Sequence, residues 1–243
     1  MTDHKGMVDE AWEQLGLDQP ERAAALARLV LTHHPDEIDA YVVLAATREI
    51  RTEAVALLKE AARIGAKVAV ADHSQHGEHG ATYDLDAHVR ALNNLARLLW
   101  ADPRPGSRED ALKHARRALR LDPYDRAGTR LLLMAWEAAA GNWLAARRIT
   151  RRYRAEDRTE VRYWLALHAF RDRALDADTL LDKALATNPH VLAALDRRIV
   201  PMHLPTGSYL LGSPEEAAIY AIDARDGWEN TPGAMKWLSS HMV

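Results

Sequence analysis

Residues 109–150 read EDALKHARRALRLDPYDRAGTRLLLMAWEAAAGNWLAARRIT, and this stretch decides the fold. Its apolar residues recur at helical spacing through a first helix, which ends just before Pro123, and a second apolar helix begins after a short turn. A third helix follows Gly141-Asn142. Because two short helices cannot bury their apolar faces alone, the stretch predicts further helices of the same kind.

The rest of the chain repeats this pattern of amphipathic segments separated by turn residues. Helices are expected over residues 7–15, 19–33, 37–48, 52–65, 85–100, 108–120, 125–139, 142–154, 159–172 and 176–187. Ser213-Pro214 and Thr231-Pro232 each begin a further short helix, since a hydroxyl residue followed by proline is typical of a helix start. The sequence therefore predicts an all-α protein.

Two connections are less regular. Residues 66–84 become polar and are interrupted by glycine, although residues 67–71 are compatible with a helix extension or a short strand. Residues 190–212 begin helically and then contain two prolines and two glycines. The predicted organisation is a set of N-terminal hairpins at 1–65, an irregular His-rich connection at 66–84, further hairpins at 85–189, and a loop with capping helices at 190–243.

An internal repeat is visible when the chain is aligned on Pro35, Pro123 and Pro189. The residues at three fixed offsets before these prolines are small or aliphatic: Ala23, Ala111 and Ala177; Ala27, Ala115 and Leu181; Val30, Ala118 and Ala184. The last two prolines are 66 residues apart, which is two units of 33. Small residues are needed where helices approach closely, and proline fixes the exit turn.

This repeat resembles the tetratricopeptide repeat, a helix-turn-helix unit of about 34 residues. The resemblance implies a right-handed α-α superhelix of about five hairpins. The two last helices, which begin at Ser213 and Thr231, would cap its C-terminal end, since a terminal repeat needs a polar outer face.

A narrower resemblance covers the C-terminal two-thirds of the chain. The turn DRAGTRLLL at 125–133 is similar to the D-N-x-G-x-R-Y-L-L turn of bacterial repeat proteins related to the suppressor-of-tumorigenicity-7 family. NPHV at 188–191, GSPEEA at 212–217 and TPGAMKWL at 231–238 match further segments of that group in the same order. After Val191 the chain departs, because it reads LAAL where the group continues P-x-Y-L-L-G. The resemblance implies an interaction protein without enzyme activity.

Composition narrows the class of protein further. The chain has no cysteine, which excludes disulfides, thiolate metal sites and thiol catalysis. Its N-terminus has no apolar core of a secretory signal, and no apolar run approaches the roughly 18–20 residues of a membrane span. We expect a soluble, cytoplasmic protein that does not enter a membrane.

Charge is unevenly distributed along the chain. Residues 1–96 carry 9 Lys/Arg and 16 Asp/Glu, residues 97–173 carry 18 and 10, and residues 174–243 carry 5 and 9. The basic middle would attract an acidic partner, or it could hold adjacent helices together by internal ion pairs.

A concave groove lined by the first helix of each unit is implied by the tetratricopeptide resemblance. The candidates that face it, counted from the boundary prolines, are Asn93, Arg97, Arg130, Met134, Arg162 and Phe170. The polar members are similar to the Asn/Lys/Arg sets with which some such arrays bind a peptide carboxylate. Arg130 and Arg162, 32 residues apart, are expected along one surface; ion pairs to Asp or Glu within the array are the alternative.

The predicted function is a protein–protein interaction module, an adaptor or chaperone-like scaffold, whose groove binds a peptide or partner protein. An acidic segment suits the arginines of that groove, and homo-oligomerisation stays open. We expect no cofactor and no catalysis, because no nucleophile elbow, phosphate loop or zinc-protease motif occurs. His168, in the middle of a helix, is expected to be a core histidine.

A metal site is the first alternative function. His73, His76 and His79 are spaced three residues apart, and imidazoles so placed on a helix or in a compact loop could share Zn²⁺ or Ni²⁺. A metal sensor or metal-dependent enzyme would follow. The competing interpretation is a solvated loop that is rich in histidine.

Nucleic-acid binding is the second alternative. Residues 147–154 read RRITRRYR, a basic strip of the kind that binds phosphate backbones. The strip lacks interleaved aromatic side chains beyond Tyr153, and a solvated face that pairs with Glu156, Asp157 and Glu160 is the competing interpretation.

Overall fold

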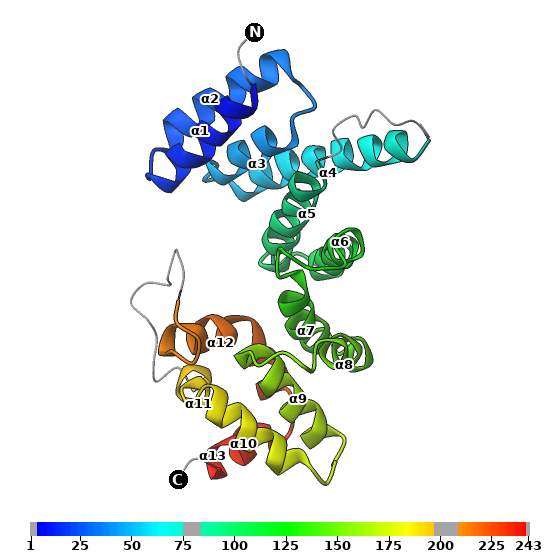
Figure 1. Ribbon diagram of the computed structural model, residues 1–243, viewed down its shortest axis with the longest axis vertical. Coiled ribbons are helices and arrows are strands. Elements are labelled where there is room, and N and C mark those ends of the chain that lie inside the picture. The colour runs from blue at the N-terminus through cyan, green and yellow to red at the C-terminus, as the bar shows by residue number, and fades with distance from the viewer. Residues whose placement is uncertain (1–3, 75–83, 197–208, 242–243) are drawn as a thin grey trace. The chain divides into compact units, whose positions relative to one another are not determined.

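The computed structural model describes residues 4–74, 84–196 and 209–241 (Figure 1). Every regular element in these ranges is an α-helix, which confirms the all-α prediction. None of the helices in these ranges is long and apolar enough to cross a membrane. The chain divides into two compact units, Met1–Thr129 (unit 1) and Arg130–Val243 (unit 2).

Unit 1 is a series of helices that pack on their neighbours in chain order. Its elements are α1 (His4–Gly16), α2 (Pro20–His33), α3 (Ile38–Ala46), α4 (Arg51–Ser74), α5 (Leu85–Trp100) and α6 (Ser107–Leu121). The closest packing joins α1 with α2, α3 with α4 and α5 with α6, so the unit consists of consecutive helical hairpins (Figure 1).

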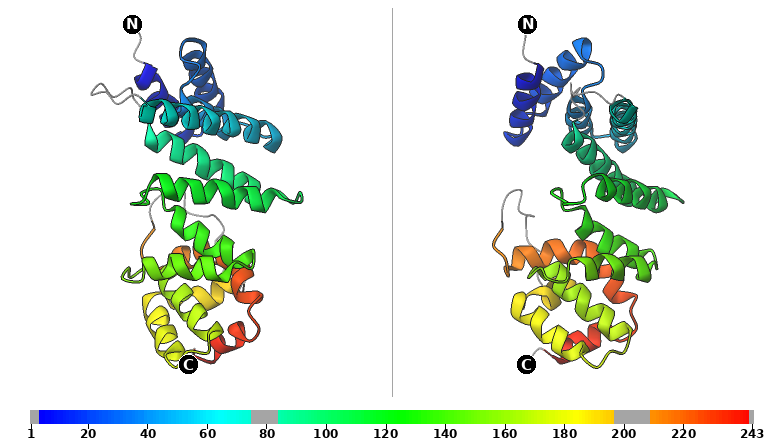
Figure 2. Two further views of the ribbon diagram at one scale, coloured as in Figure 1. Left: turned by 90° about the vertical axis from the view of Figure 1, so that its right-hand side faces the viewer. Right: turned by 45° about the vertical axis from the view of Figure 1, so that its right-hand side comes forward.

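Unit 2 holds most of α7 (Thr129–Ala139) and all the later helices. These are α8 (Trp143–Arg152), α9 (Thr159–Arg171), α10 (Ala177–Thr187), α11 (Val191–Leu195), α12 (Pro214–Glu229) and α13 (Ala234–Ser240). The α9–α10 hairpin continues the pattern of unit 1. In contrast, α12 (orange in Figure 2) returns to pack on α9 as well as on α11.

The positions that revealed the repeat are buried. The nine residues at the three aligned offsets lie in α2, α6 and α10. Eight of them are fully buried, and the ninth, Ala177, is 8% exposed. Each of the three helices ends two residues before its proline, at His33, Leu121 and Thr187. The next residue then donates its backbone N–H to the carbonyl of Val30, Ala118 or Ala184. The three prolines that align the sequence repeat therefore follow the same kind of helix end in α2, α6 and α10.

Helix caps follow the sequence where polar side chains stand at the predicted positions. The Ser213 hydroxyl accepts a hydrogen bond from the Glu216 backbone N–H at 3.2 Å, and Pro214 is the first residue of α12. Asp84 caps α5 in the same way, accepting from the Ala87 N–H at 2.9 Å. Both helix starts were predicted correctly.

Two helix boundaries differ from the prediction by four residues or more. Helix α4 continues to Ser74, so the connection expected from residue 66 begins later; the segment 66–74 contains no proline to end the helix. Helix α7 begins at Thr129 rather than at 125, because Asp125 (φ 52°) and Gly128 (φ 69°) adopt left-handed backbone conformations. Such residues cannot continue a right-handed helix.

Candidate ligand-binding surfaces

Unit 1 has two adjoining hollows on either side of Asn94 and Arg97 of α5, and together we name them the α5 groove. The first has a volume of about 390 Å³ and is lined by α5 and the connection that follows α6. The second, about 480 Å³, is lined mainly by apolar side chains of α3, α4 and α5, together with Trp12. Asn94 and Arg97 line both hollows. We call the first the polar hollow, because most of its residues are charged or amides, and the second the apolar hollow, because most of its residues are apolar.

Most charged groups of the α5 groove are already paired. Arg126 donates to the Asp86 carboxylate at 2.7 Å, and Arg90 lies 3.5 Å from the carboxylate of Asp39. Arg97 is exposed, and its guanidinium forms no hydrogen bond or ion pair with any residue that the structure describes. Arg97 is therefore a cation of this groove that is available to a ligand, whereas Arg51 donates to the Ala101 carbonyl and Arg48 lies 3.9 Å from the Glu53 carboxylate.

Asn93 does not face the groove as a free amide. Its side chain is only 9% exposed and exchanges hydrogen bonds with the Thr129 hydroxyl, at 2.8 Å and 3.0 Å. The pair fixes the first residue of α7 to α5. The half-buried Asn94 takes the position beside Arg97 instead, a residue that the sequence prediction missed. Helical spacing could have found it, since residues 90, 94 and 97 share one face.

Arg130 and Arg162 both bind the connection between α8 and α9. Arg130 donates to the Glu156 carboxylate at 2.8 Å and lies over the Tyr153 ring, 4.8 Å from its centroid. Arg162 donates to Asp157 at 2.8 Å, and this hydrogen bond lowers the pKa of the Asp157 carboxyl below its ordinary value. These contacts correspond to the alternative of ion pairs within the array.

The two apolar groove candidates serve the interior of unit 2. Met134 is fully buried, so its side chain is not offered to a partner. Phe170 stacks on Trp237, with ring centroids 4.5 Å apart, and this contact attaches α13 to α9. Of the six candidates, Asn93 and Arg97 belong to unit 1 and the other four to unit 2, so we treat the two sets as separate surfaces.

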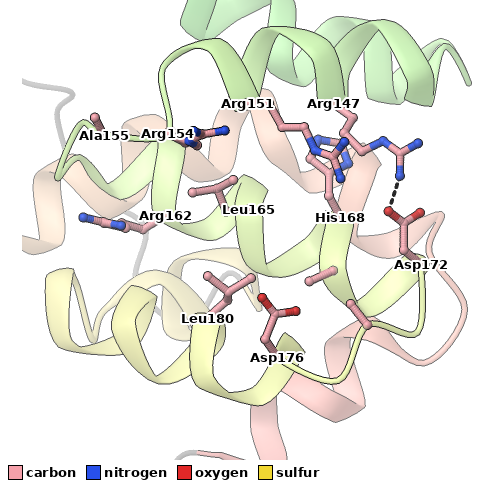
Figure 3. Close-up of a pocket in the computed structure, with 12 residues that line it drawn as sticks. Arg147, Arg151, Arg154, Ala155, Arg162, Leu165, His168, Asp172, Asp176 and Leu180 are labelled. Carbon is pink, nitrogen blue, oxygen red and sulfur yellow. Dashed lines mark hydrogen bonds and ion pairs between the residues drawn. The ribbon is translucent and has the colours of Figure 1, made fainter.

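A third surface lies between α8, α9 and the start of α10, and we name it the arginine hollow (Figure 3). Its volume is about 590 Å³. Arg147, Arg151, Arg154 and Arg162 line it, together with Asp172 and Asp176, and Leu165 and Leu180 lie between them. Arg148 and Arg152 do not line it, so the basic strip of the sequence is divided between two faces.

His168 lies at the base of the arginine hollow and is a core histidine, as predicted. Its side chain is 6% exposed, and burial lowers the pKa of the imidazole to about 4. The Nε2 atom is 3.3 Å from the Thr150 hydroxyl, and the rings of Trp143 and Trp164 lie about 6 Å away. A neutral imidazole held in this way completes the packing of α8 on α9.

The proposed metal ligands cannot be placed. The side chain of His73 and the whole of His76 and His79 lie outside the described residues. Among the residues that the structure does describe, no group of three His, Asp or Glu side chains could hold a metal ion.

Fold and surfaces together define an all-α protein of helical hairpins with two charged hollows. Neither the comparison with protein-family models nor the comparison with curated proteins finds a match to this chain.

Proposed function

We propose that this chain is a protein-interaction module, an adaptor or scaffold, and that its α5 groove binds an acidic segment of a partner protein. The observation that carries the proposal is the state of Arg97, an exposed guanidinium without a partner among the described side chains, at the junction of a polar and an apolar hollow. A charge-assisted hydrogen bond from arginine to a carboxylate is among the stronger polar contacts.

The chemistry of the neighbouring residues supports this choice of ligand. Asn94 offers an amide beside Arg97, and both donate to a carboxylate without competing for the same oxygen. On the other side, Val42, Leu58 and Leu98 line the apolar hollow, which suits an aliphatic or aromatic side chain next to that carboxylate. A segment of a protein supplies both groups in one chain.

We also infer that the hairpins are tetratricopeptide-type repeats. The support comes from the three prolines with identical helix ends before them and from the buried small residues at fixed offsets. In such an array, extended concave surfaces are the usual place for a partner.

The test uses photo-cross-linking from within the groove. Replacing Ala46, an exposed residue that lines the apolar hollow, by the photoreactive amino acid p-benzoylphenylalanine in the full chain, followed by mass spectrometry of cross-linked peptides, identifies what lies in the groove. We expect partner segments rich in Asp and Glu, and we expect their yield to fall about tenfold with Arg97→Glu.

The matched control is Arg120→Glu, which reverses an exposed arginine on α6 outside the groove. Cross-links that persist in Arg97→Glu, or that join segments without acidic residues, would contradict the proposal. An equal loss in Arg120→Glu would show that general charge attraction, rather than the groove, selects the partner.

A further inference from the structure

We infer that the arginine hollow of unit 2 is a second binding site, for an acidic peptide segment that carries an aliphatic side chain between its carboxylates. This site is independent of the α5 groove, since every residue that lines it belongs to unit 2. Three features of the hollow support the inference: its unpaired arginines, the order of its side chains, and the two acidic residues that also line it.

Two of the four arginines are not neutralised within the protein. Arg147 forms an ion pair with Asp172, and Arg162 donates to Asp157. Arg151 and Arg154 are exposed, and their side chains form no hydrogen bond or ion pair within the described ranges. An anionic ligand would therefore gain two guanidinium partners without breaking an existing pair.

The order of the side chains matches an alternation of acidic and aliphatic groups. Arg151 lies beside His168 at one end of the hollow, and Arg154 lies toward Arg162 at the other (Figure 3). Leu165 and Leu180 lie between the two ends. Both leucines are only partly buried, so each can still lose water-exposed apolar surface to a ligand.

The remaining lining residues disfavour a nucleic acid. Asp172 and Asp176 also line the hollow, Asp172 paired with Arg147 and Asp176 beside Leu180 (Figure 3), and a continuous phosphate backbone would meet these carboxylates. Arg148 and Arg152, which a phosphate-binding strip would use, lie outside the hollow, and Arg152 is placed over the Tyr153 ring at 5.6 Å. A peptide can place its carboxylates selectively at the arginines, whereas a phosphate backbone is charged at every nucleotide.

Fluorescence anisotropy of the full-length protein tests the inference. The probe is a short fluorescein-labelled peptide in which glutamates flank a leucine. We expect Arg151→Glu with Arg154→Glu to weaken binding about tenfold or more, because both charge-assisted contacts are lost. Arg148→Glu with Arg152→Glu makes the same charge change on the same segment and should weaken binding less than about threefold.

The apolar part of the hollow has its own test. A second peptide carries glycine in place of the leucine. Leu180→Gln should lower the affinity for the leucine peptide to the level of the glycine peptide. The affinity for the glycine peptide should not change. Thermal unfolding followed by circular dichroism establishes that each variant is folded, and Arg97→Glu should bind the probe like the unaltered protein.

Four outcomes would overturn the inference. Equal weakening by the two double variants would leave only general electrostatic attraction. Tighter binding of an oligodeoxythymidylate of the same charge would assign the surface to nucleic acid. An unchanged affinity of Leu180→Gln for the leucine peptide would remove the aliphatic contact. Loss of binding with Arg97→Glu would place the peptide in the α5 groove instead.

Discussion

The two units bury different kinds of side chain around the same kind of hairpin. In the described part of unit 1, the large fully buried side chains are aliphatic, namely Leu58, Leu92 and Leu95. In unit 2 the largest are Trp136, Trp164, Trp228 and Tyr163. Wide aromatic rings fill the space between α9 and the returning helix α12, whereas neighbouring helices in unit 1 pack closely through small residues.

Both units nevertheless share one device, a helical glycine that accommodates a ring. A Cβ atom on Gly65 of α4 would lie 2.4 Å from the His88 ring, and one on Gly227 of α12 would lie 2.5 Å from the Trp164 ring. The rings are almost completely buried, so neither has room to move. Glycine at these two places is thus required by packing rather than by backbone conformation.

Removing the central ring of unit 2 should cause the largest loss of stability. Trp164→Ala is expected to lower the free energy of unfolding of unit 2 by about 3–5 kcal/mol, because a fully buried ring leaves a cavity. Hydrogen exchange read by mass spectrometry should show faster exchange in α9, α10 and α12. Equal acceleration in α1–α3 would show that the two units do not unfold separately.

Adding one methyl group at each glycine should have a smaller effect. Gly65→Ala and Gly227→Ala are each expected to destabilise their own unit by about 1–3 kcal/mol in urea unfolding, because the added carbon meets a buried ring. Gly16→Ala is the control, since a Cβ there meets no atom within 4 Å. Alanine at this helical position should be neutral or stabilising by up to about 1 kcal/mol. A stabilised Gly227→Ala variant would contradict the contact with Trp164.

Protonation should have an effect of similar size to the glycine substitutions, and in unit 1 it depends on two buried groups. Burial lowers the pKa of the His88 imidazole in the folded protein to about 4. Between pH 6.5 and 4 the unfolded chain therefore binds a proton at His88 that the folded chain does not, and stability falls as the pH drops through this range. Burial raises the pKa of the Asp39 carboxyl to about 6, although nearby Arg90 opposes this shift. The stabilisation from the protonated carboxyl is therefore fully present below pH 3.8 and is lost as the pH rises through 6. The two dependences oppose each other over most of this range.

Asp39→Asn should therefore expose the dependence on His88. We expect the variant to lose about 1–3 kcal/mol more stability than the unaltered protein when the pH falls from 6.5 to 4, measured by urea unfolding. Parallel pH profiles of the two proteins would show that Asp39 does not hold its proton in the folded state. Asp86→Asn, at an exposed acid of the same unit, is the control for removing one charge.

Sequence periodicity was sufficient to locate most of the helices. Apolar spacing located the helices, and the aligned prolines located three equivalent helix ends, because these features depend on residues within one or two turns of each other. The start of α7 was missed because the apolar spacing of residues 125–139 does not reveal that Asp125 and Gly128 adopt left-handed conformations. The return of α12 onto α9 has no local signal at all.

The surfaces were harder to predict than the fold. Helical spacing correctly placed Arg97 on the surface, but it could not show that the Asn93 amide binds Thr129, which is 36 residues away. The basic strip was visible, whereas its division into a lined hollow and an outer face depends on how α9 and α10 pack against α8. Contacts between residues distant in sequence thus decide which polar side chains stay available to a ligand.

The bond between Trp136 and Asp223 has a consequence for synthesis on the ribosome. The indole N–H of Trp136 on α7 donates to the Asp223 carboxylate on α12 at 3.2 Å, across 87 residues. Hairpins of unit 1 can close as soon as each second helix emerges, since their partners are adjacent in the chain. The aromatic interior of unit 2 stays incomplete until α12 has left the exit tunnel, so the nascent chain exposes those rings for longest.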